Sequence, residues 1–348
     1  MPKILLLVSV AVLMQGCSSL AYYWEKIQGH TEILSKQEPV QEVIDNPKTP
    51  DKVRQKLIST QKARVFASEV LQLPDNDSYK NYVDLKQDYV VWTVVATPPY
   101  SIKAKQWCFF IVGCLSYKGY FSEQDAEASA KELKAENMDV YVSGTKAYST
   151  LGWFDDPLLS TMLYNSEAYR VGIIFHELAH QKMYVEDDTS FNEGFASTVE
   201  LEGIQAWFSR DTKKEEYKRY IIFRERDDAF KKLLQATREE LKQAYSLNLD
   251  SKAMHENKIK IFNELQLAYK KLKEQWRGYS GYDKWMSQDL NNAHLALIAT
   301  YNDHIPAFRK LFKNVNNDYE LFYQQVEKIS ELDKDKRSEE LNKLMKIN

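Results

Sequence analysis

One short stretch of the chain carries the residue types of a hydrolytic metal site. His176, Glu177 and His180 form an H-E-x-x-H pattern. On a helix this spacing places the two imidazoles one turn apart on the same face, where both rings can bind one zinc ion. Glu177 lies beside them, so its carboxylate can reach a water molecule on the metal and remove its proton as a general base. The pattern therefore predicts metal-assisted hydrolysis.

A catalytic zinc site needs a third protein ligand and keeps its fourth position for water. Glu193, in the run NEGFA, can be that ligand if a second helix begins near Ser190 and packs beside the first. We therefore predict one Zn2+ per chain, bound by His176, His180 and Glu193. The acidic residues of the intervening loop are competing ligands: Glu186, Asp187 and Asp188.

These residues also have structural interpretations. His176 and His180 can be hydrogen-bonded core histidines, and Glu193 can complete a capping box with Ser190, because S-x-x-E fits that motif. The chain has only six histidines, so a chance H-E-x-x-H is uncommon, and the NEGFA run after it makes chance less common still. We favour the metal site for this reason.

The two expected helices differ in what they contribute. The first runs from about Ser166 to Tyr184, and its apolar residues extend nearly all round it, which predicts a buried helix. On the second, Glu200 stands seven residues after Glu193 and hence on nearly the same face. It could hold a ligating imidazole through the other ring nitrogen. A solvated or capped glutamate is the alternative.

The run HELAHQ followed by NEGFASTVE resembles the core of the aminopeptidase-N family of gluzincins. The resemblance implies a zinc peptidase in which His176, His180 and Glu193 bind the metal and Glu177 is the base. Two features depart from that family. The spacer from His180 to Glu193 has twelve residues, which is shorter than usual, and the chain has no GxMEN run, which recognises the free amino terminus there. Exopeptidase specificity is therefore not carried over.

The chain as a whole looks more like a family of bacterial lipoproteins described as predicted aminopeptidases, on runs such as YSTLGWFDDPLLSTM and NNAHLA. Lys3 and the apolar core at 4–14 have the charge and length of a signal peptide. Cys17 follows a sequence that resembles a lipobox, so residues 1–16 would be cleaved and Cys17 lipidated. Ser18 after it implies an outer-membrane location facing the periplasm. An ordinary cleaved signal or an anchor helix is the alternative.

The net charge of −3 argues against nucleic acid as a partner. Cys108 and Cys114 lie in WCFFIVGC and would be about 20 Å apart in an extended strand. A disulfide between them requires the chain to fold back, which Val112-Gly113 could allow. Because an exported protein meets an oxidising compartment, we favour the disulfide over two buried thiols.

The patterns predict an α+β protein that is predominantly helical. Residues 17–84 are helical, and residues 85–209 combine runs rich in β-branched and aromatic residues with the H-E-x-x-H helix. We expect that second segment to be a zincin-like catalytic core. Residues 210–348 are charged and helical, with a helical hairpin followed by an amphipathic C-terminal segment that caps it.

Two further sets of residues are predicted to act on the substrate. In the zinc peptidases that this chain resembles, a strand before the H-E-x-x-H helix often lies along the cleft. The resemblance implies that the corresponding segment could pair with a peptide backbone: Ser149, Thr150, Leu151, Gly152 and Trp153. Such enzymes also need a donor that stabilises the oxyanion. His294 and Tyr301 are the candidates, with Tyr148 and Tyr169 behind them. Core packing is the alternative for each.

The predicted function is a zinc-dependent peptidase, first of all an aminopeptidase, that acts on peptides at the bacterial cell envelope and is held to the membrane by its lipid anchor. An endopeptidase or oligopeptidase of the same mechanism would fit the missing GxMEN run. A zinc-binding scaffold lipoprotein without turnover would have a fourth ligand close to the metal, such as Asp187 or Asp188, and no use for Glu177.

Overall fold

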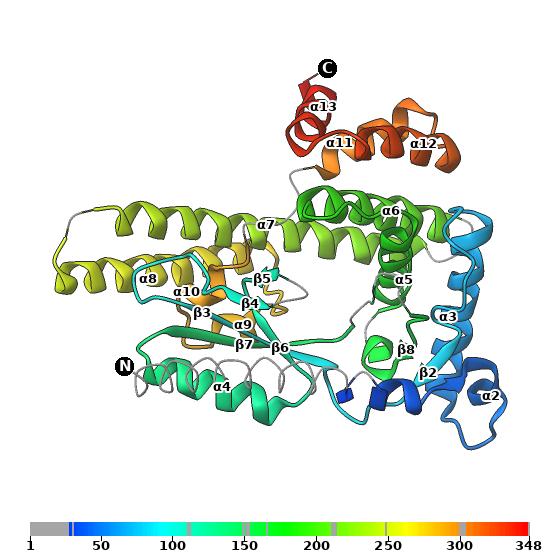
Figure 1. Ribbon diagram of the computed structural model, residues 1–348, viewed down its shortest axis with the longest axis horizontal. Coiled ribbons are helices and arrows are strands. Elements are labelled where there is room, and N and C mark those ends of the chain that lie inside the picture. Colours follow the sequence, from blue (N-terminus) through cyan, green and yellow to red (C-terminus); the bar gives the residue numbers. More distant parts are fainter. Residues whose placement is uncertain are drawn as a thin grey trace, which may run out of the picture. The chain divides into compact units, whose positions relative to one another are not determined.

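The computed structural model describes residues 28–29, 31–109, 113–147, 150, 154–164, 166–209, 214–247, 249–298 and 304–346. Its contacts divide the chain into two compact units that alternate along the sequence. Unit 1 comprises Met1–Lys36, Leu85–Tyr148 and Asp228–Ala299, and unit 2 comprises Gln37–Asp84, Ser149–Asp227 and Thr300–Asn348. Helices dominate the described part, with small sheets between them, which confirms the predicted class (Figure 1).

Unit 2 is built around two long helices, α5 (Glu167–Lys182) and α6 (Thr189–Ser209), which pack against each other. Helix α3 (Asp51–Glu69) packs on α5. Strand β2 (Asn81–Val83) pairs with two shorter strands, antiparallel with one and parallel with the other. The remaining elements are β1 (Glu38–Pro39), α2 (Val40–Asp45), β8 (Leu158–Leu159) and the 3-10 helix η1 (Ser160–Tyr164).

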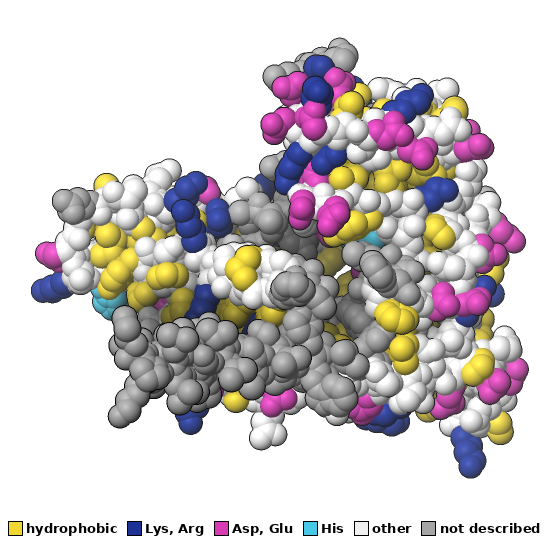
Figure 2. All heavy atoms as spheres, in the orientation of Figure 1, with side chains coloured by type: hydrophobic (Ala, Val, Ile, Leu, Met, Phe, Trp, Pro, Cys, Tyr) yellow, Lys and Arg dark blue, Asp and Glu magenta, His cyan; other side chains and the backbone are white. Residues whose placement is uncertain are grey.

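Three C-terminal helices complete unit 2: α11 (Ile305–Asn314), α12 (Tyr319–Ser330) and α13 (Lys334–Lys346). Buried aromatic rings join them to α6. The ring of Phe195 lies 6.1 Å from that of Phe308 and 5.9 Å from that of Phe322, both as centroid distances. The face of the C-terminal helices seen in Figure 2 carries interspersed acidic and basic side chains. Their apolar side is therefore turned to α6 and their charged side to solvent.

Unit 1 contains an antiparallel sheet in the order β6 (Lys118–Tyr120), β3 (Val91–Thr97), β7 (Asp139–Thr145). Helix α4 (Glu123–Ala135) packs on this sheet through Ala126, Ala130 and Leu133. Alanines on the inner face let the helix lie close to the strands. The short helices α9 (Asp283–Met286) and α10 (Asn292–Leu295) follow later in the chain.

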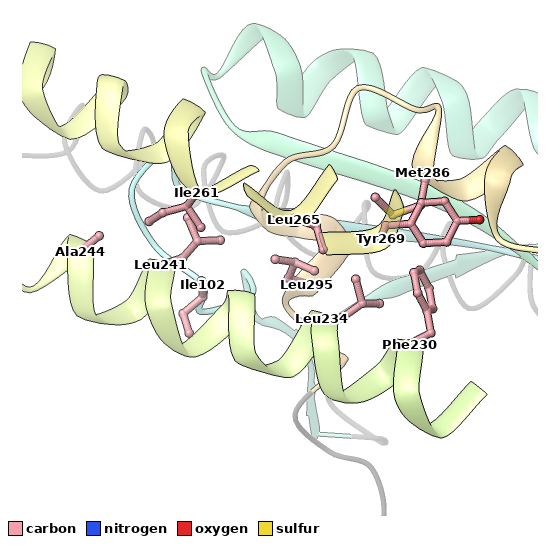
Figure 3. Packing of buried hydrophobic residues seen from close by; sticks show 10 residues of the cluster. All are labelled: Ile102, Phe230, Leu234, Leu241, Ala244, Ile261, Leu265, Tyr269, Met286 and Leu295. Carbon is pink, nitrogen blue, oxygen red and sulfur yellow. The ribbon is translucent and has the colours of Figure 1, made fainter. Parts of the chain in front are cut away.

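The predicted helical hairpin is formed by α7 (Lys214–Tyr245), whose residues from Asp228 onward belong to unit 1, and α8 (Ser251–Gln275). Its buried apolar residues interlock between the two helices (Figure 3). Phe230, Leu234 and Leu241 point from α7 toward Ile261, Leu265 and Tyr269 on α8. The hairpin was predicted because both segments are long and charged and contain neither proline nor glycine.

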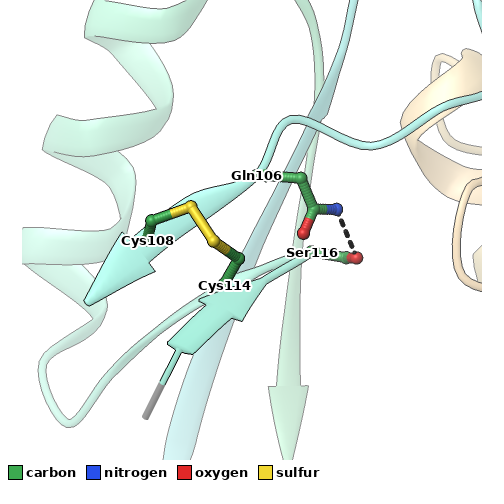
Figure 4. Close-up of a disulfide and its surroundings, with 4 residues drawn as sticks. All are labelled: Gln106, Cys108, Cys114 and Ser116. Carbon is green, nitrogen blue, oxygen red and sulfur yellow. Dashed lines mark hydrogen bonds between the residues drawn. A yellow bond between two sulfur atoms is a disulfide. The ribbon is translucent and has the colours of Figure 1, made fainter. Parts of the chain in front are cut away.

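Cys108 and Cys114 form a disulfide in unit 1 (Figure 4). They face each other in the short hairpin of β4 (Trp107–Phe109) and β5 (Gly113–Leu115), where the chain folds back between them. Gly113 has φ +72°, a left-handed conformation that favours glycine. None of the described helices is long and apolar enough to cross a membrane.

The contact units differ from the three consecutive segments expected from the sequence. Strands β3, β6 and β7 belong to unit 1, whereas the H-E-x-x-H helix belongs to unit 2, so residues 85–209 do not gather in one unit. The C-terminal helices belong to unit 2, where α11 packs on α6, and their role as a cap on the hairpin stays a prediction. The units differ from consecutive segments because the packing joins residues far apart in the chain.

Candidate metal centre

Three of the predicted ligands converge in unit 2. The Nε2 atoms of His176 and His180 lie 3.1 Å apart. Glu193 places Oε2 3.3 Å from Nε2 of His176 and Oε1 3.5 Å from Nε2 of His180. The ligand atoms all lie within 4.8 Å of one another, and no other such group of His, Cys, Asp and Glu occurs among the described residues.

Helix α5 holds the histidines because its start and its apolar face are both fixed. The hydroxyl oxygen of Ser166 accepts a hydrogen bond from the backbone N–H of Tyr169 at 3.3 Å, which caps the helix. The apolar residues of the sequence pattern are almost completely buried: Val171, Ile174, Phe175 and Leu178. With those faces packed, the remaining face presents both imidazoles to α6.

Two glycines let α5 and α6 approach closely. A Cβ atom on Gly172 would lie 2.8 Å from Cδ1 of Ile204 and 3.2 Å from Oε1 of Glu200. A Cβ atom on Gly203 would lie 2.7 Å from Cδ2 of Phe175. Glycine inside a helix costs about 1 kcal/mol relative to alanine. The absence of a side chain at Gly172 leaves the space in which the carboxylate of Glu200 reaches α5.

Glu200 contacts the ring nitrogen of His176 that faces away from the cluster. Its Oε2 lies 3.2 Å from Nδ1 of His176. An Nδ1–H that donates to this carboxylate leaves the Nε2 lone pair free for a metal. The sequence left this contact and a solvated or capped glutamate as alternatives, and the structure has the contact. Among the described residues, Nδ1 of His180 has no corresponding hydrogen-bond partner.

The electrostatics of the cluster favour a cation. Burial lowers the pKa of His176, but hydrogen bonds to Glu193 and Glu200 outweigh it and raise that pKa to about 10. Burial raises the pKa of Glu193, while the two histidines outweigh it and hold that pKa well below its usual value. Positive charge is therefore stabilised where the three ligands meet.

Glu177 is partly buried and follows His176 on α5. Its charge contributes to the raised pKa of His176. Tyr169, a lesser candidate for the oxyanion donor, also lies on α5, seven residues before His176. Burial raises the pKa of the Tyr169 hydroxyl, and the charges of Glu200 and Glu177 raise it further. Among the other three candidate donors, His294 belongs to unit 1, and Tyr148 and Tyr301 lie outside the described residues.

The loop between α5 and α6 is held by two side chains for which the sequence predicted no such role. Asn192 donates from Nδ2 to the carbonyl of Val185 at 2.7 Å and accepts the N–H of Val185 at 2.8 Å. Asp188 accepts the N–H of Phe191 at 3.2 Å and so caps α6, which begins at Thr189, near Ser190 as the sequence predicted. Ser190 therefore lies inside the helix and is not the capping residue of the alternative capping box with Glu193.

Asp188, a competing ligand in the sequence analysis, is engaged elsewhere. Its Oδ2 accepts a hydrogen bond from Nε of Arg337 at 2.9 Å, and both side chains are almost completely buried. The adjacent Asp187 has φ +58°, and its carbonyl accepts a hydrogen bond from Lys334 at 2.6 Å. Neither residue belongs to the cluster of metal ligands.

His294 lies in unit 1, at the third position of α10. Its Nδ1 accepts the backbone N–H of Asn291 at 3.2 Å, which completes a capping box, and its ring stacks on Tyr141 with centroids 4.1 Å apart. Burial lowers the pKa of His294 to about 4. These contacts give the residue a structural role, and its catalytic role stays a prediction.

Thr150 is the one residue of the expected substrate-binding segment that the structure describes, and it does not lie in a strand. Its backbone N–H donates to Oδ2 of Asp156 at 2.9 Å, and its hydroxyl lies 2.8 Å from Oδ1. The N–H is therefore engaged within the protein. The following predicted residues lie outside the described part: Cys17, Ser149, Leu151, Gly152, Trp153, Tyr148 and Tyr301.

A helix pair that brings an H-E-x-x-H pattern together with a downstream glutamate defines a class of candidate metal-binding proteins. Within that class, residues 21–341 match the family model described as "Putative aminopeptidase". Because the match covers most of the chain, the protein belongs to this family. No curated protein and no solved structure matches it.

Proposed function

We propose that this protein is a zinc-dependent peptidase that acts as an aminopeptidase. The observation that carries the proposal is the convergence of His176, His180 and Glu193, next to Glu177, in a member of a family described as aminopeptidases. The description of the family supports peptide hydrolysis, and the converging side chains support a metal-assisted mechanism of the gluzincin type.

The side chains of the cluster fit zinc. Two imidazole nitrogens and one carboxylate are the protein ligands of many catalytic zinc sites, which keep a further position for water or substrate. Asp188 is bound to Arg337, so it does not add a fourth protein ligand. When bound, zinc supplies a Lewis acid that polarises a peptide carbonyl and makes water more acidic.

The residues around the cluster would divide the work. Glu200 accepts the Nδ1–H of His176 and fixes the orientation and tautomer of that ring. Glu177 accepts a proton from the attacking water as its oxygen bonds to the peptide carbon. When the carbon–nitrogen bond breaks, the protonated Glu177 returns this proton to the leaving amine. His294 and Tyr301 remain our candidates for the oxyanion donor.

The proposal includes the location inferred from the sequence. Lipidation of Cys17 would hold the protein at the outer membrane, facing the periplasm, where peptides are the substrate. The endopeptidase alternative differs only in the substrate terminus, and the missing GxMEN run favours it. The scaffold alternative is disfavoured by the three-ligand cluster and by Glu177 beside it.

The test uses the soluble form from Ser18 onward, with its metal content and its cleavage of amino-free and acetylated peptides measured together. We expect one zinc per chain and cleavage of amino-free peptides only. Glu177→Gln should keep the zinc and lose activity by on the order of 100- to 10,000-fold, since it removes the general base. Glu186→Gln, an exposed glutamate in the following loop, is the matched control.

The outcomes separate the candidates. Cleavage of acetylated peptides would make the protein an endopeptidase. Bound zinc with no cleavage of any peptide would favour the scaffold. A wild-type protein that binds no zinc would refute the proposal.

A further inference from the structure

We propose that Arg337, on the C-terminal helix α13, is a positioning residue for the metal ligand Glu193. It acts through Asp188, which it holds at the start of α6. The inference rests on the zinc site proposed above, and it adds a residue that contacts none of the reacting atoms. Arg337 lies 149 residues after Asp188 in the chain.

Asp188 determines where α6 begins. Its Oδ1 accepts the N–H of Phe191 at 3.2 Å, and its backbone carbonyl accepts the N–H of Asn192 at 3.1 Å. Glu193 is the next residue. Because each helical residue is rotated by about 100° from the one before, the direction of Glu193 follows from the position of this cap.

Arg337 fixes the cap in turn. Its Nε donates to Oδ2 of Asp188 at 2.9 Å, and the exposed fractions of the two side chains are 9% and 5%. Its Nη1 donates to the carbonyl of Ser330 at 3.1 Å and also to that of Leu332. The guanidinium carbon lies 5.8 Å from the ring centroid of Phe191, in the first turn of α6. A buried carboxylate without this partner would be an uncompensated charge.

A second contact ties α13 to the same loop. Lys334, at the start of α13, donates to the carbonyl of Asp187 at 2.6 Å. Helix α13 is itself capped by Asp333, which accepts the N–H of Lys336 at 3.1 Å. The first turn of α13 therefore binds both residues that precede α6, Asp187 through Lys334 and Asp188 through Arg337.

Arg309 offers a matched control. It lies on α11 and donates from Nε to Glu202 on α6 at 2.6 Å, so it too is an arginine of a C-terminal helix bound to an acid of α6. Glu202 stands nine residues beyond Glu193, far from the start of the helix. A substitution of Arg309 removes an ion pair between a C-terminal helix and α6, and it leaves the contacts of Asp188 at the start of α6 unchanged.

The experiment compares Arg337→Leu and Arg309→Leu with the wild type. It measures the zinc dissociation constant by chelator competition, the visible spectrum of the Co2+-substituted protein and the melting temperature. We expect Arg337→Leu to weaken zinc binding about 10- to 100-fold and to change the Co2+ spectrum, because Glu193 is displaced. Arg309→Leu should leave both metal readouts as in the wild type.

A double variant covers the case in which Arg337→Leu does not fold. Asp188→Asn with Arg337→Gln removes both buried charges and keeps polar groups at the cap and at its partner. We expect this variant to fold and to bind zinc within about threefold of the wild type. A double variant that folds and binds zinc more than tenfold more weakly would overturn the view that the contact acts by holding the cap.

Two results would refute the inference in distinguishable ways. If Arg337→Leu lowers the melting temperature but binds zinc as the wild type does, with the same Co2+ spectrum, then Arg337 serves stability alone. If the wild type itself binds no zinc, the proposed function fails first and the inference fails with it.

Discussion

Two groups of largely buried polar side chains, one in each unit, are arranged in opposite ways. In unit 1 the set is centred on Asn292, whose Nδ2 donates to the carbonyl of Pro99 at 2.9 Å and whose Oδ1 accepts from the hydroxyl of Tyr245 at 2.7 Å. Its N–H donates to Asp139 at 3.0 Å, and Lys258 donates to the same carboxylate at 2.5 Å. Donors and acceptors alternate, and the charges balance.

In unit 2, groups that accept a proton or a metal face one another instead. The two Nε2 atoms lie 3.1 Å apart, with the carboxylate of Glu193 beside both. Such a set is completed by a cation, whereas the set around Asn292 is complete in itself. Burial and polarity alone thus do not distinguish the candidate metal site from the set around Asn292. The distinguishing feature is that groups which each accept a proton or a metal face one another.

The comparison is tested most severely by His180→Ala. The variant removes one of three ligands, so bound zinc and peptide cleavage should both be lost, which elemental analysis after dialysis and a peptidase assay would show. His255→Ala, an exposed histidine of α8, should keep both. Zinc retained by His180→Ala would contradict the proposed ligand set.

Asn292→Ala should have the opposite effect. It leaves the hydroxyl of Tyr245 and the carbonyl of Pro99 without this partner, which should lower the free energy of unfolding by about 3 kcal/mol. Zinc content should not change. Denaturant unfolding checks the first statement, with Asn263→Ala on the exposed side of α8 as the control. Loss of zinc in Asn292→Ala would break the distinction between the two sets.

His294, on the same helix α10 as Asn292, should make the stability of the protein depend on pH. Burial lowers the pKa of His294 from 6.5 to about 4, so the unfolded chain binds a proton that the folded one does not. Stability should fall as the pH drops from about 6.5 to 4, by at most about 3 kcal/mol from this group. His294→Gln keeps a side chain that can complete the capping box and should remove this part of the pH dependence. Unfolding curves at several pH values check it, and an unchanged slope would contradict it.

Glu200→Gln should have the smallest effect. The amide still contacts Nδ1 of His176 but lacks the charge that strengthens the hydrogen bond. Zinc affinity should fall about tenfold, or about 1.4 kcal/mol. Chelator competition measures it. Equal affinities would show that Glu200 does not support the ligand.

The sequence predicted the parts of this protein that depend on local pattern. The H-E-x-x-H helix from about Ser166 and the hairpin of α7 and α8 were both expected from the pattern of residues within one segment. Glu193 was predicted from the NEGFA run, and Glu200 was a possible partner of a ligating imidazole because its spacing puts it on nearly the same helix face.

What the sequence did not show depends on contacts between distant segments. The separation of the β3 sheet from the H-E-x-x-H helix into different units has no local signal. The pairing of Arg337 with Asp188 has no local signal either, because nothing in the sequence distinguishes Arg337 from the other charged residues around it. Asn192 did carry a signal, because it stands inside the NEGFA run, but its bonds to Val185 could be seen only in the folded chain.

The double hydrogen bond between Asn192 and Val185 bears on how this spacer can change length over evolution. The pair closes the loop on itself, so residues inserted at Glu186 or Asp187 would bulge outward while the helices on either side keep their phase. A residue inserted between Asp188 and Glu193 would instead turn α6 by about 100° and point a neighbour at the histidines. Spacers longer than the twelve residues found in this chain are therefore compatible with the same ligands, provided that the additions fall inside the loop.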